Sequence, residues 1–345
     1  MGRLILHIGA HKTATSYIQD VLALNETLLA DHGVIYPNIW PNNAHHVLTA
    51  PWRPEITETT GFTAEQADEW YAKLAREHAK SDRTVILSAE PYSRAAQGET
   101  DFAQLASRVE AFDEVVILYV LRHQWELLQS LYLQFTTDWK RPPRFESMLQ
   151  TAMREPRTAG VPLDHEWVID HVMKGFDQDS IHFANYEIIR HTPDGVLSPI
   201  VDLLGWDGLP EGFEPHKRSN VSADPLATYV AHRMNPNLAP KGTHIRRIRN
   251  IMDVAFGAGT RTAIFNKDEA EALDARYRAS NQALFDRLGG HSKYLDNVPF
   301  SWKDDIVQRD QIDEDFLFLM GRRLFVALEQ QFAENKALQQ QQQPD

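Results

Sequence analysis

The first nineteen residues place a buried strand, a short loop and the start of a helix in immediate succession. Residues 3–9 (RLILHIG) are almost wholly apolar, which is typical of a parallel strand covered on both faces. Residues 10–16 (AHKTATS) form a small-residue loop that contains Lys12, and the pattern from Tyr17 onward predicts a helix. The loop also carries the hydroxyl side chains of Thr13, Thr15 and Ser16. Backbone N–H groups at a helix N-terminus are unpaired, so this arrangement predicts a site for a phosphate or a sulfate ester.

Three further apolar runs alternate with helical patterns along the first half of the chain. The runs are residues 84–88 (TVILS), 115–121 (VVILYVL) and 181–184. The predicted helices between them are residues 16–31, 64–80, 102–111 and 125–139. This alternation predicts an α/β fold built on a doubly wound parallel sheet. After about residue 190 the pattern is mainly helical, and it is expected to shape an acceptor pocket. We expect one domain over residues 1–335, followed by a low-complexity tail, 336–345, without regular structure.

Composition excludes several classes of protein. There is no cysteine among the 345 residues, which excludes disulfides, thiolate nucleophiles and cysteine-based zinc sites. No apolar run approaches the roughly 20 residues that span a bilayer, and the first strand follows Met1 too closely for a signal peptide. We therefore expect a soluble cytoplasmic protein. The formal net charge of −13 argues against nucleic acid or an anionic membrane as partner, but a small anionic ligand remains possible.

The N-terminal loop differs from the phosphate-binding loop of ATP and GTP hydrolases. That motif, G-x-x-x-x-G-K-[ST], places its lysine after the second glycine. Here Ala14 stands five residues after Gly9, and Lys12 precedes that position. Hydrolysis of ATP or GTP is therefore disfavoured, and an ordinary strand–helix turn with an exposed lysine is the alternative interpretation.

A second polar constellation follows the predicted strand 115–121. Arg122 comes directly after this strand, and Ser130 lies eight residues further on, in the predicted helix. Ligands of open α/β sheets bind beyond the carboxyl ends of the strands, and the planar guanidinium group suits phosphate. The alternative is that Arg122 pairs with a surface carboxylate and Ser130 faces solvent.

These two segments carry a resemblance to a known family. Residues 7–16 (HIGAHKTATS) resemble the 5′-phosphosulfate loop of the sulfotransferases, especially of bacterial members with the pattern H-I-G-x-H-K-T-G-T-[TS]. Residues 119–132 (YVLRHQWELLQSLY) resemble the strand and helix that bind the 3′-phosphate in that family. The order and separation of the two segments also match, and the likeness extends in outline over residues 1–290.

The resemblance implies a P-loop-like fold and the sulfuryl donor 3′-phosphoadenosine 5′-phosphosulfate (PAPS), with 3′-phosphoadenosine 5′-phosphate (PAP) as product. It implies that Lys12 contacts the 5′-phosphosulfate and neutralises charge on the bridging oxygen. Thr13, Ala14, Thr15 and Ser16 would line the cradle, and Arg122 and Ser130 would hold the 3′-phosphate. Residues 216–220 (HKRSN) resemble the late basic loop that closes the donor site in many sulfotransferases, which would bring Arg218 and Ser219 to the 3′-phosphate. The alternative is a solvated loop before a helix N-cap near Ser222. No metal and no covalent intermediate are implied.

Ala14 is a departure from the family pattern, which usually has glycine there. If the position needs a positive φ, alanine costs about 1 kcal/mol or more. Because Ala14 stands next to the expected helix start, ordinary helical angles are the alternative.

Three side chains are candidates for the general base that deprotonates a hydroxyl or amine acceptor. Glu90 ranks first because it follows strand 84–88, where partial burial would raise the carboxyl pKa toward neutrality. His46, next to His45, ranks second, since histidine titrates near neutral pH without any shift. His11, inside the loop, ranks third. A local cap or salt bridge is the alternative role for Glu90.

The remaining motifs favour no other chemistry. His45-His46 and His165-Glu166 lack the spacing of metal ligands, and there is no G-x-S-x-G elbow. The basic run 244–249 (HIRRIR) either attracts an anionic acceptor or forms an exposed helix face. The expected acceptor is a carbohydrate, a lipid or a small metabolite. The alternative functions are a P-loop-like nucleotide kinase and a non-catalytic protein that binds a nucleotide or a sulfated ligand.

Overall fold

The computed structural model describes residues 1–94, 99–215, 223–288, 293–294, 300, 302 and 305–341. The chain divides into two compact units. The first unit comprises Met1–Leu128, Met148–Ser219 and Leu273–Phe300. The second comprises Gln129–Ser147, Asn220–Ala272 and Ser301–Asp345. Among the described residues, no helix is both long and apolar enough to cross a membrane.

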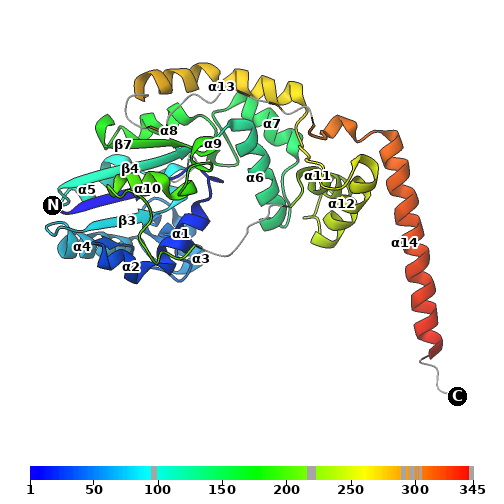
Figure 1. Ribbon diagram of the computed structural model, residues 1–345, viewed down its shortest axis with the longest axis horizontal. Coiled ribbons are helices and arrows are strands. Elements are labelled where there is room, and N and C mark those ends of the chain that lie inside the picture. Colours follow the sequence, from blue (N-terminus) through cyan, green and yellow to red (C-terminus); the bar gives the residue numbers. More distant parts are fainter. Residues whose placement is uncertain are drawn as a thin grey trace. The chain divides into compact units, whose positions relative to one another are not determined.

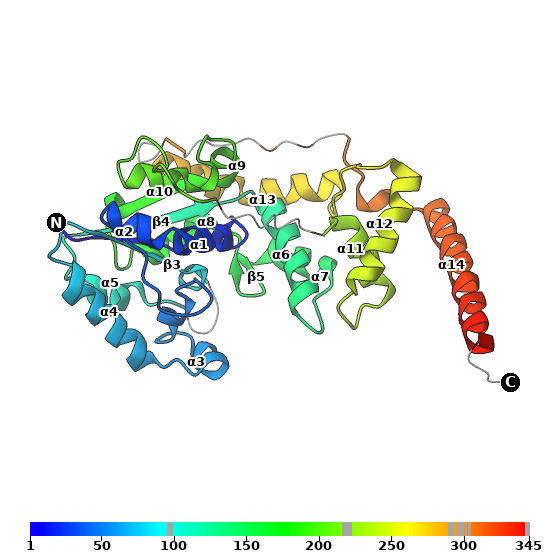
Figure 2. The ribbon, with the colours of Figure 1, turned by 60° about the horizontal axis from the view of Figure 1, so that its bottom comes forward.

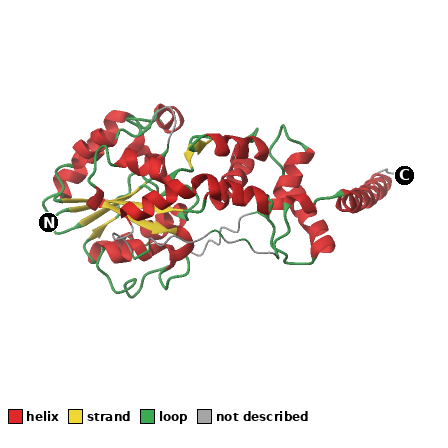
Figure 3. Ribbon diagram, turned by 90° about the horizontal axis from the view of Figure 1, so that it is seen from above, coloured by secondary structure: helices red, strands yellow, loops and turns green. Residues whose placement is uncertain are grey.

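A five-stranded parallel sheet forms the centre of the first unit (Figure 1, Figure 3). Its order is β2-β3-β1-β4-β7. The bounds are β1 Arg3–His7, β2 Val34–Ile35, β3 Thr84–Ser88, β4 Glu114–Leu121 and β7 Ile181–Asn185. The four strands predicted from apolar runs are all present, and the two-residue edge strand β2 was not predicted. The α/β fold class with a parallel sheet is therefore confirmed.

Helices cover both faces of this sheet, which makes it doubly wound (Figure 2). Alternate residues of β1 point to opposite faces, so Leu4 and Leu6 pack in one core cluster and Ile5 in the other. The cluster around Ile5 includes residues of α1 (Thr15–Leu24), α2 (Glu26–Asp31) and α10 (Ser198–Leu203). The opposite cluster includes residues of α4 (Ala64–His78), α5 (Phe102–Val109), α8 (His165–Val172) and α13 (Lys267–Leu288). The unit also contains α3 (Pro54–Thr60), α9 (Tyr186–Ile189) and the two-stranded pair β5 (Arg157–Thr158) and β6 (Val161–Pro162).

The helix predicted over residues 16–31 is instead two helices, α1 and α2, separated at Asn25. The Asn25 amide nitrogen donates to the carbonyl oxygens of Val21 (2.8 Å) and Glu214 (2.9 Å), and its side-chain oxygen accepts from the Glu214 N–H (2.8 Å). Asparagine side chains compete with the helical backbone for hydrogen bonds in this way. The break therefore depends on a residue far away in sequence, which the local pattern does not reveal.

The second unit is helical. It holds α11 (Pro225–Met234), α12 (Gly242–Phe256) and α14 (Glu314–Gln341). Helices α6 (Gln124–Asp138), α7 (Phe145–Arg154) and α13 each contribute residues to both units. Helix α14 continues to Gln341, so residues 336–341 of the expected irregular tail are helical. Alanine, leucine and glutamine are good helix formers, which extends α14 into this segment. Residues 342–345 lie outside the described part.

Candidate active site at the carboxyl edge of the sheet

The register of the sheet brings three strand ends to one edge. His7, the last residue of β1, pairs with Ser88 at the end of β3 on one side and with Leu118 of β4 on the other. The chain passes from β1 to β2 and β3 on one side of β1, and then to β4 and β7 on the other side. The switch point between β1 and β4 is where ligands bind in open parallel sheets. The loops after β1, β3 and β4 all begin at this edge.

The β1–α1 loop, residues 8–14, has an unusual backbone. Gly9, Lys12 and Ala14 have φ values of 28°, 64° and 62°. A side chain on Gly9 would lie 2.8 Å from Thr15 Cγ2, so glycine is required there by both conformation and space. Ala14 is the N-cap residue of α1 and is left-handed, with ψ of 25°. Of the two conformations considered for Ala14, the structure has the one with positive φ, because the loop turns sharply before α1 begins.

The loop presents backbone donors more than hydroxyl donors. The N–H groups of Thr13, Ala14, Thr15 and Ser16 have no hydrogen-bond partner within the described part of the chain. The Thr13 hydroxyl, by contrast, donates to the Ala10 carbonyl oxygen (2.7 Å), and the Thr15 hydroxyl donates to Glu90. Ser16 is exposed. A run of unpaired N–H groups at a helix start fits an anionic group, with Lys12 in the same loop.

Arg122 joins the end of β4 to this loop. Its Nη1 donates to the Lys12 carbonyl oxygen (2.7 Å), and its Nη2 donates to Glu126 (3.1 Å). The guanidinium group also lies over the Tyr186 ring, 4.9 Å from the centroid. Five N–H donors are available on an arginine, so some remain for a ligand. The two segments singled out by their sequence are thus in direct contact.

Glu187 is a site residue that the sequence analysis missed. It follows β7, and its Oε1 lies 3.8 Å from Arg122 Nε. Burial, reinforced by the neighbouring carboxylate of Glu126, raises the pKa of Glu187 to about 7. Asn185-Tyr186-Glu187 stands at the carboxyl end of a predicted strand, so the argument that selected Arg122 and Glu90 would also have selected Glu187.

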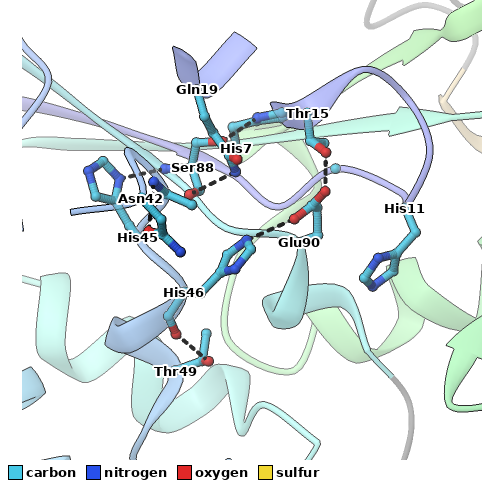
Figure 4. A network of polar contacts seen from close by, with 12 residues as sticks. His7, His11, Thr15, Gln19, Asn42, His45, His46, Thr49, Ser88 and Glu90 are labelled. Atoms are coloured by element: carbon cyan, nitrogen blue, oxygen red, sulfur yellow. Dashed lines mark hydrogen bonds and ion pairs between the residues drawn. The ribbon is translucent and has the colours of Figure 1, made fainter. Parts of the chain in front are cut away.

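Glu90 connects the β1–α1 loop to a histidine (Figure 4). Its Oε1 accepts from the Thr15 hydroxyl, and its Oε2 lies 2.8 Å from His46 Nε2. Glu90 begins the short 3₁₀ segment Glu90–Ser93 after β3, and His46 begins another, His46–Thr49. His46 Nδ1 has no hydrogen-bond partner among the residues that the structure describes. Two hydrogen bonds thus connect Thr15, at the start of α1, through Glu90 to the partly exposed His46.

The expected rise in the pKa of Glu90 is wrong. Burial does favour the neutral carboxyl group, but it is outweighed by the hydrogen bond with His46, the proximity of His11 and His46, and the hydrogen bond from Thr15. Together these contacts hold the pKa of Glu90 well below its usual range. Glu90 is therefore a carboxylate at neutral pH and a weak base.

His11 occupies a less favourable position than the other two candidate bases. It is buried, and its Nε2 accepts a hydrogen bond from Arg94 Nε (3.1 Å). Burial lowers the pKa of His11 to about 3. Its lone pair is already used, and the ring stays neutral, so it contributes little to proton transfer.

A network of buried polar side chains lies next to Glu90 and His46 (Figure 4). The Ser88 hydroxyl lies 2.9 Å from His7 Nδ1 and 3.2 Å from Gln19 Nε2. His45 accepts from the Ser88 N–H (2.9 Å) and donates to the Pro37 carbonyl oxygen (2.7 Å). Burial lowers the pKa of His7 and of His45 to about 4 each, so both rings are neutral. These histidines fix the end of β3, from which Glu90 projects.

The remaining predicted site residues are not brought into this cluster by any described contact. Ser130 lies on α6 in the second unit and is half-buried. Arg218 and Ser219 lie outside the described residues. Within the described part of the chain, no group of three or more acidic or histidine side chains has an arrangement that would hold a metal.

Comparison with known proteins gives distant structural matches. No family model matches the chain, and no curated protein does. A sulfotransferase from Alicyclobacillus acidocaldarius has 16% identity and a TM-score of 0.41, covering 79% of this chain and 95% of its own. The sulfotransferase domain from the curacin biosynthetic pathway has 13% identity and a TM-score of 0.39, covering 80% and 97%. Retinol dehydratase, in complex with androsterone and inactive cofactor PAP, has 13% identity and a TM-score of 0.37, covering 86% and 83%. The solved structures that this chain is similar to thus include sulfotransferases, the family that its two strand-end segments resemble.

Proposed function

We propose that this protein transfers a sulfuryl group from PAPS to a hydroxyl or amine of an acceptor. The observation that carries the proposal is the hydrogen bond from Arg122 Nη1 to the Lys12 carbonyl oxygen. It joins the two segments that resemble the 5′-phosphosulfate and 3′-phosphate motifs of sulfotransferases, next to a run of backbone N–H groups without a partner in the described part of the chain. A ligand with an anionic group at each end suits this arrangement.

In this proposal the protein supplies position and charge. The N–H groups of residues 13–16 and the Lys12 ammonium group hold the 5′-phosphosulfate. Arg122 holds the 3′-phosphate, and Ser130, Arg218 and Ser219 keep the supporting roles that the resemblance implies. Because Thr13 and Thr15 use their hydroxyl groups within the protein, they act through backbone N–H groups. Lys12 stabilises the charge that develops on the bridging oxygen as its bond to sulfur breaks.

We assign proton transfer to His46 and positioning to Glu90. Glu90 accepts a hydrogen bond from His46 Nε2–H, which leaves the Nδ1 lone pair as the basic site. The acceptor oxygen or nitrogen forms its bond to sulfur, the bond from sulfur to the 5′-phosphate oxygen breaks, and the acceptor proton passes to His46 Nδ1. The Glu90 carboxylate stabilises the imidazolium that results.

Donor binding is the first test. A thermal-shift and calorimetric titration compares PAP with ATP and NADPH, and we expect a large shift of the melting temperature with PAP alone.

Lys12→Ala should remove transfer activity and leave the fold intact, while Lys174→Ala, at an exposed position, should behave like the wild type. A shift with ATP that requires Mg²⁺ would favour the kinase alternative. PAP binding without turnover on any acceptor would favour the non-catalytic one.

The roles of Arg122 and of the His46–Glu90 pair are separable. Arg122→Gln should weaken PAP binding by about 2–4 kcal/mol, because a charge-assisted contact is lost. His46→Ala and Glu90→Gln should lower turnover and leave PAP affinity nearly unchanged. Since Glu90 acts through His46, Glu90→Gln in a His46→Ala background should add little. Full turnover in His46→Ala would transfer the base assignment back to Glu90.

A further inference from the structure

One cavity is lined wholly by residues of the second unit, and the proposed sulfuryl transfer does not use it. Its volume is about 340 Å³, which is within the range of small-molecule sites. Its apolar lining includes Ala231, Met234, Leu238, Ile248 and Leu324. These residues come from α11, the segment between α11 and α12, α12 itself and α14.

Two cationic side chains, Lys241 and Arg247, line the same cavity together with the imidazole of His244. The three are exposed, and none forms an ion pair within the described part of the chain. Arg249, in the same basic run, differs because it pairs with Asp224 (2.6 Å) and Asp253 (2.8 Å). Lys241 and Arg247, which have no ion-pair partner among the described residues, therefore stand out on a chain whose formal net charge is −13.

The lining chemistry selects one class of ligand. An apolar interior favours a hydrocarbon group, and the cations favour a single anionic head group at one end of it. Leu238 and Met234 are largely exposed, and a polyanion such as nucleic acid would leave both without an apolar contact. We propose that this cavity binds a free amphipathic anion: an unbranched alkyl chain of medium length that ends in a carboxylate or a sulfate.

The test uses the full-length protein and decanoate as the probe, in calorimetry below its micellar concentration. Acetate, which lacks the chain, and decanol, which lacks the charge, serve as the comparison ligands. We expect saturable one-to-one binding of decanoate and binding at least about tenfold weaker for both comparison ligands. No saturable binding of decanoate, or equal binding of decanol, would overturn the proposal.

Matched variants locate the binding site. Lys241→Gln/Arg247→Gln should weaken decanoate binding by about tenfold or more, because both head-group contacts are removed. The control is Arg246→Gln, an exposed arginine of the same helix that does not line the cavity, and it should change the affinity by less than about twofold. Equal loss in the control and in the double variant would refute the assignment to this cavity. Binding to anionic phosphatidylglycerol vesicles that decanoate does not displace would instead indicate a membrane-binding surface and overturn it.

Discussion

At the scale of single residues, Ala14 shows how the site constrains the backbone. A left-handed conformation costs an alanine about 1–2 kcal/mol, because its Cβ approaches the backbone. Here the left-handed turn immediately precedes α1, whose first N–H groups have no hydrogen-bond partner among the described residues. The protein therefore retains strain at the position where the proposed phosphosulfate site lies, as is common at functional sites.

Replacing Ala14 by glycine should relieve this strain. We expect Ala14→Gly to raise the free energy of unfolding by up to about 1 kcal/mol, after allowance for the larger entropy of glycine in the unfolded chain. The measurement is denaturant unfolding at pH 7. Ala72→Gly is the control, since Ala72 is exposed in the interior of α4, and there we expect a loss of about 1 kcal/mol. Destabilisation by both variants would show that Ala14 is unstrained.

Glu187 predicts a pH-dependent stability. Its folded-state pKa of about 7 exceeds the unfolded value near 4.3, so between these values the folded state retains a proton that the unfolded chain has lost. The wild type therefore loses stability from this group as pH rises from about 4 to about 7, and the loss levels off above that. Glu187→Gln removes the titration, so its stability relative to the wild type should rise by about 1–3 kcal/mol over this window.

The matched control is Glu110→Gln, at an exposed position in the first unit. Its difference from the wild type should stay nearly constant from pH 4 to pH 8. A flat pH profile for the Glu187→Gln difference would mean that Glu187 is ionised and paired with Arg122 throughout.

At the scale of elements, α8 fixes the carboxyl end of β4. His165, the first residue of α8, is buried. Its Nε2 is 2.8 Å from the Arg122 carbonyl oxygen, and its Nδ1 is 2.9 Å from the Tyr119 hydroxyl oxygen. Burial lowers the pKa of His165, so the neutral ring donates from Nε2 and accepts at Nδ1. One side chain thus connects a helix to the strand end from which Arg122 projects.

Loss of this connection should affect both stability and donor binding. We expect His165→Leu to cost about 2–4 kcal/mol, because it leaves a buried hydroxyl and a carbonyl oxygen unpaired, and Tyr119→Phe to cost about 1 kcal/mol. Only His165→Leu frees the Arg122 backbone, so it should weaken PAP binding more than Tyr119→Phe does. Calorimetry with PAP on both variants measures this, and equal affinities would show that α8 does not position Arg122.

At the scale of the whole molecule, the two proposed ligand sites use different segments of the chain. Hydrogen exchange should therefore separate them. PAP should protect residues 9–16 and the segment 120–130, and decanoate should protect residues 231–248. Protection of residues 231–248 by PAP would show that the two sites are energetically coupled.

The sequence predicted the parallel strands because a strand buried on both faces is apolar along its whole length. It also selected Lys12, as the lysine of the loop between the first strand and its helix, and Glu90 and Arg122, since polar residues that follow such strands lie at one edge of the sheet. It missed the break at Asn25, which depends on Glu214. It also misjudged the pKa of Glu90, because the partners of that carboxylate, Thr15 and His46, come from other segments.

What this chain determines locally is the identity of its strands and the kind of residue that follows each of them. Short-range apolar patterning is sufficient for that, because it reflects which faces of an element are buried. Only the tertiary structure decided which polar groups already have a hydrogen-bond partner. The hydroxyl groups of Thr13 and Thr15 donate to other groups of the protein. Glu90 is hydrogen-bonded to His46, and Arg122 donates to the β1–α1 loop. Hydrogen bonds and charges act over a few ångströms in space, and contacts between residues 75 or 110 positions apart cannot be read from local sequence.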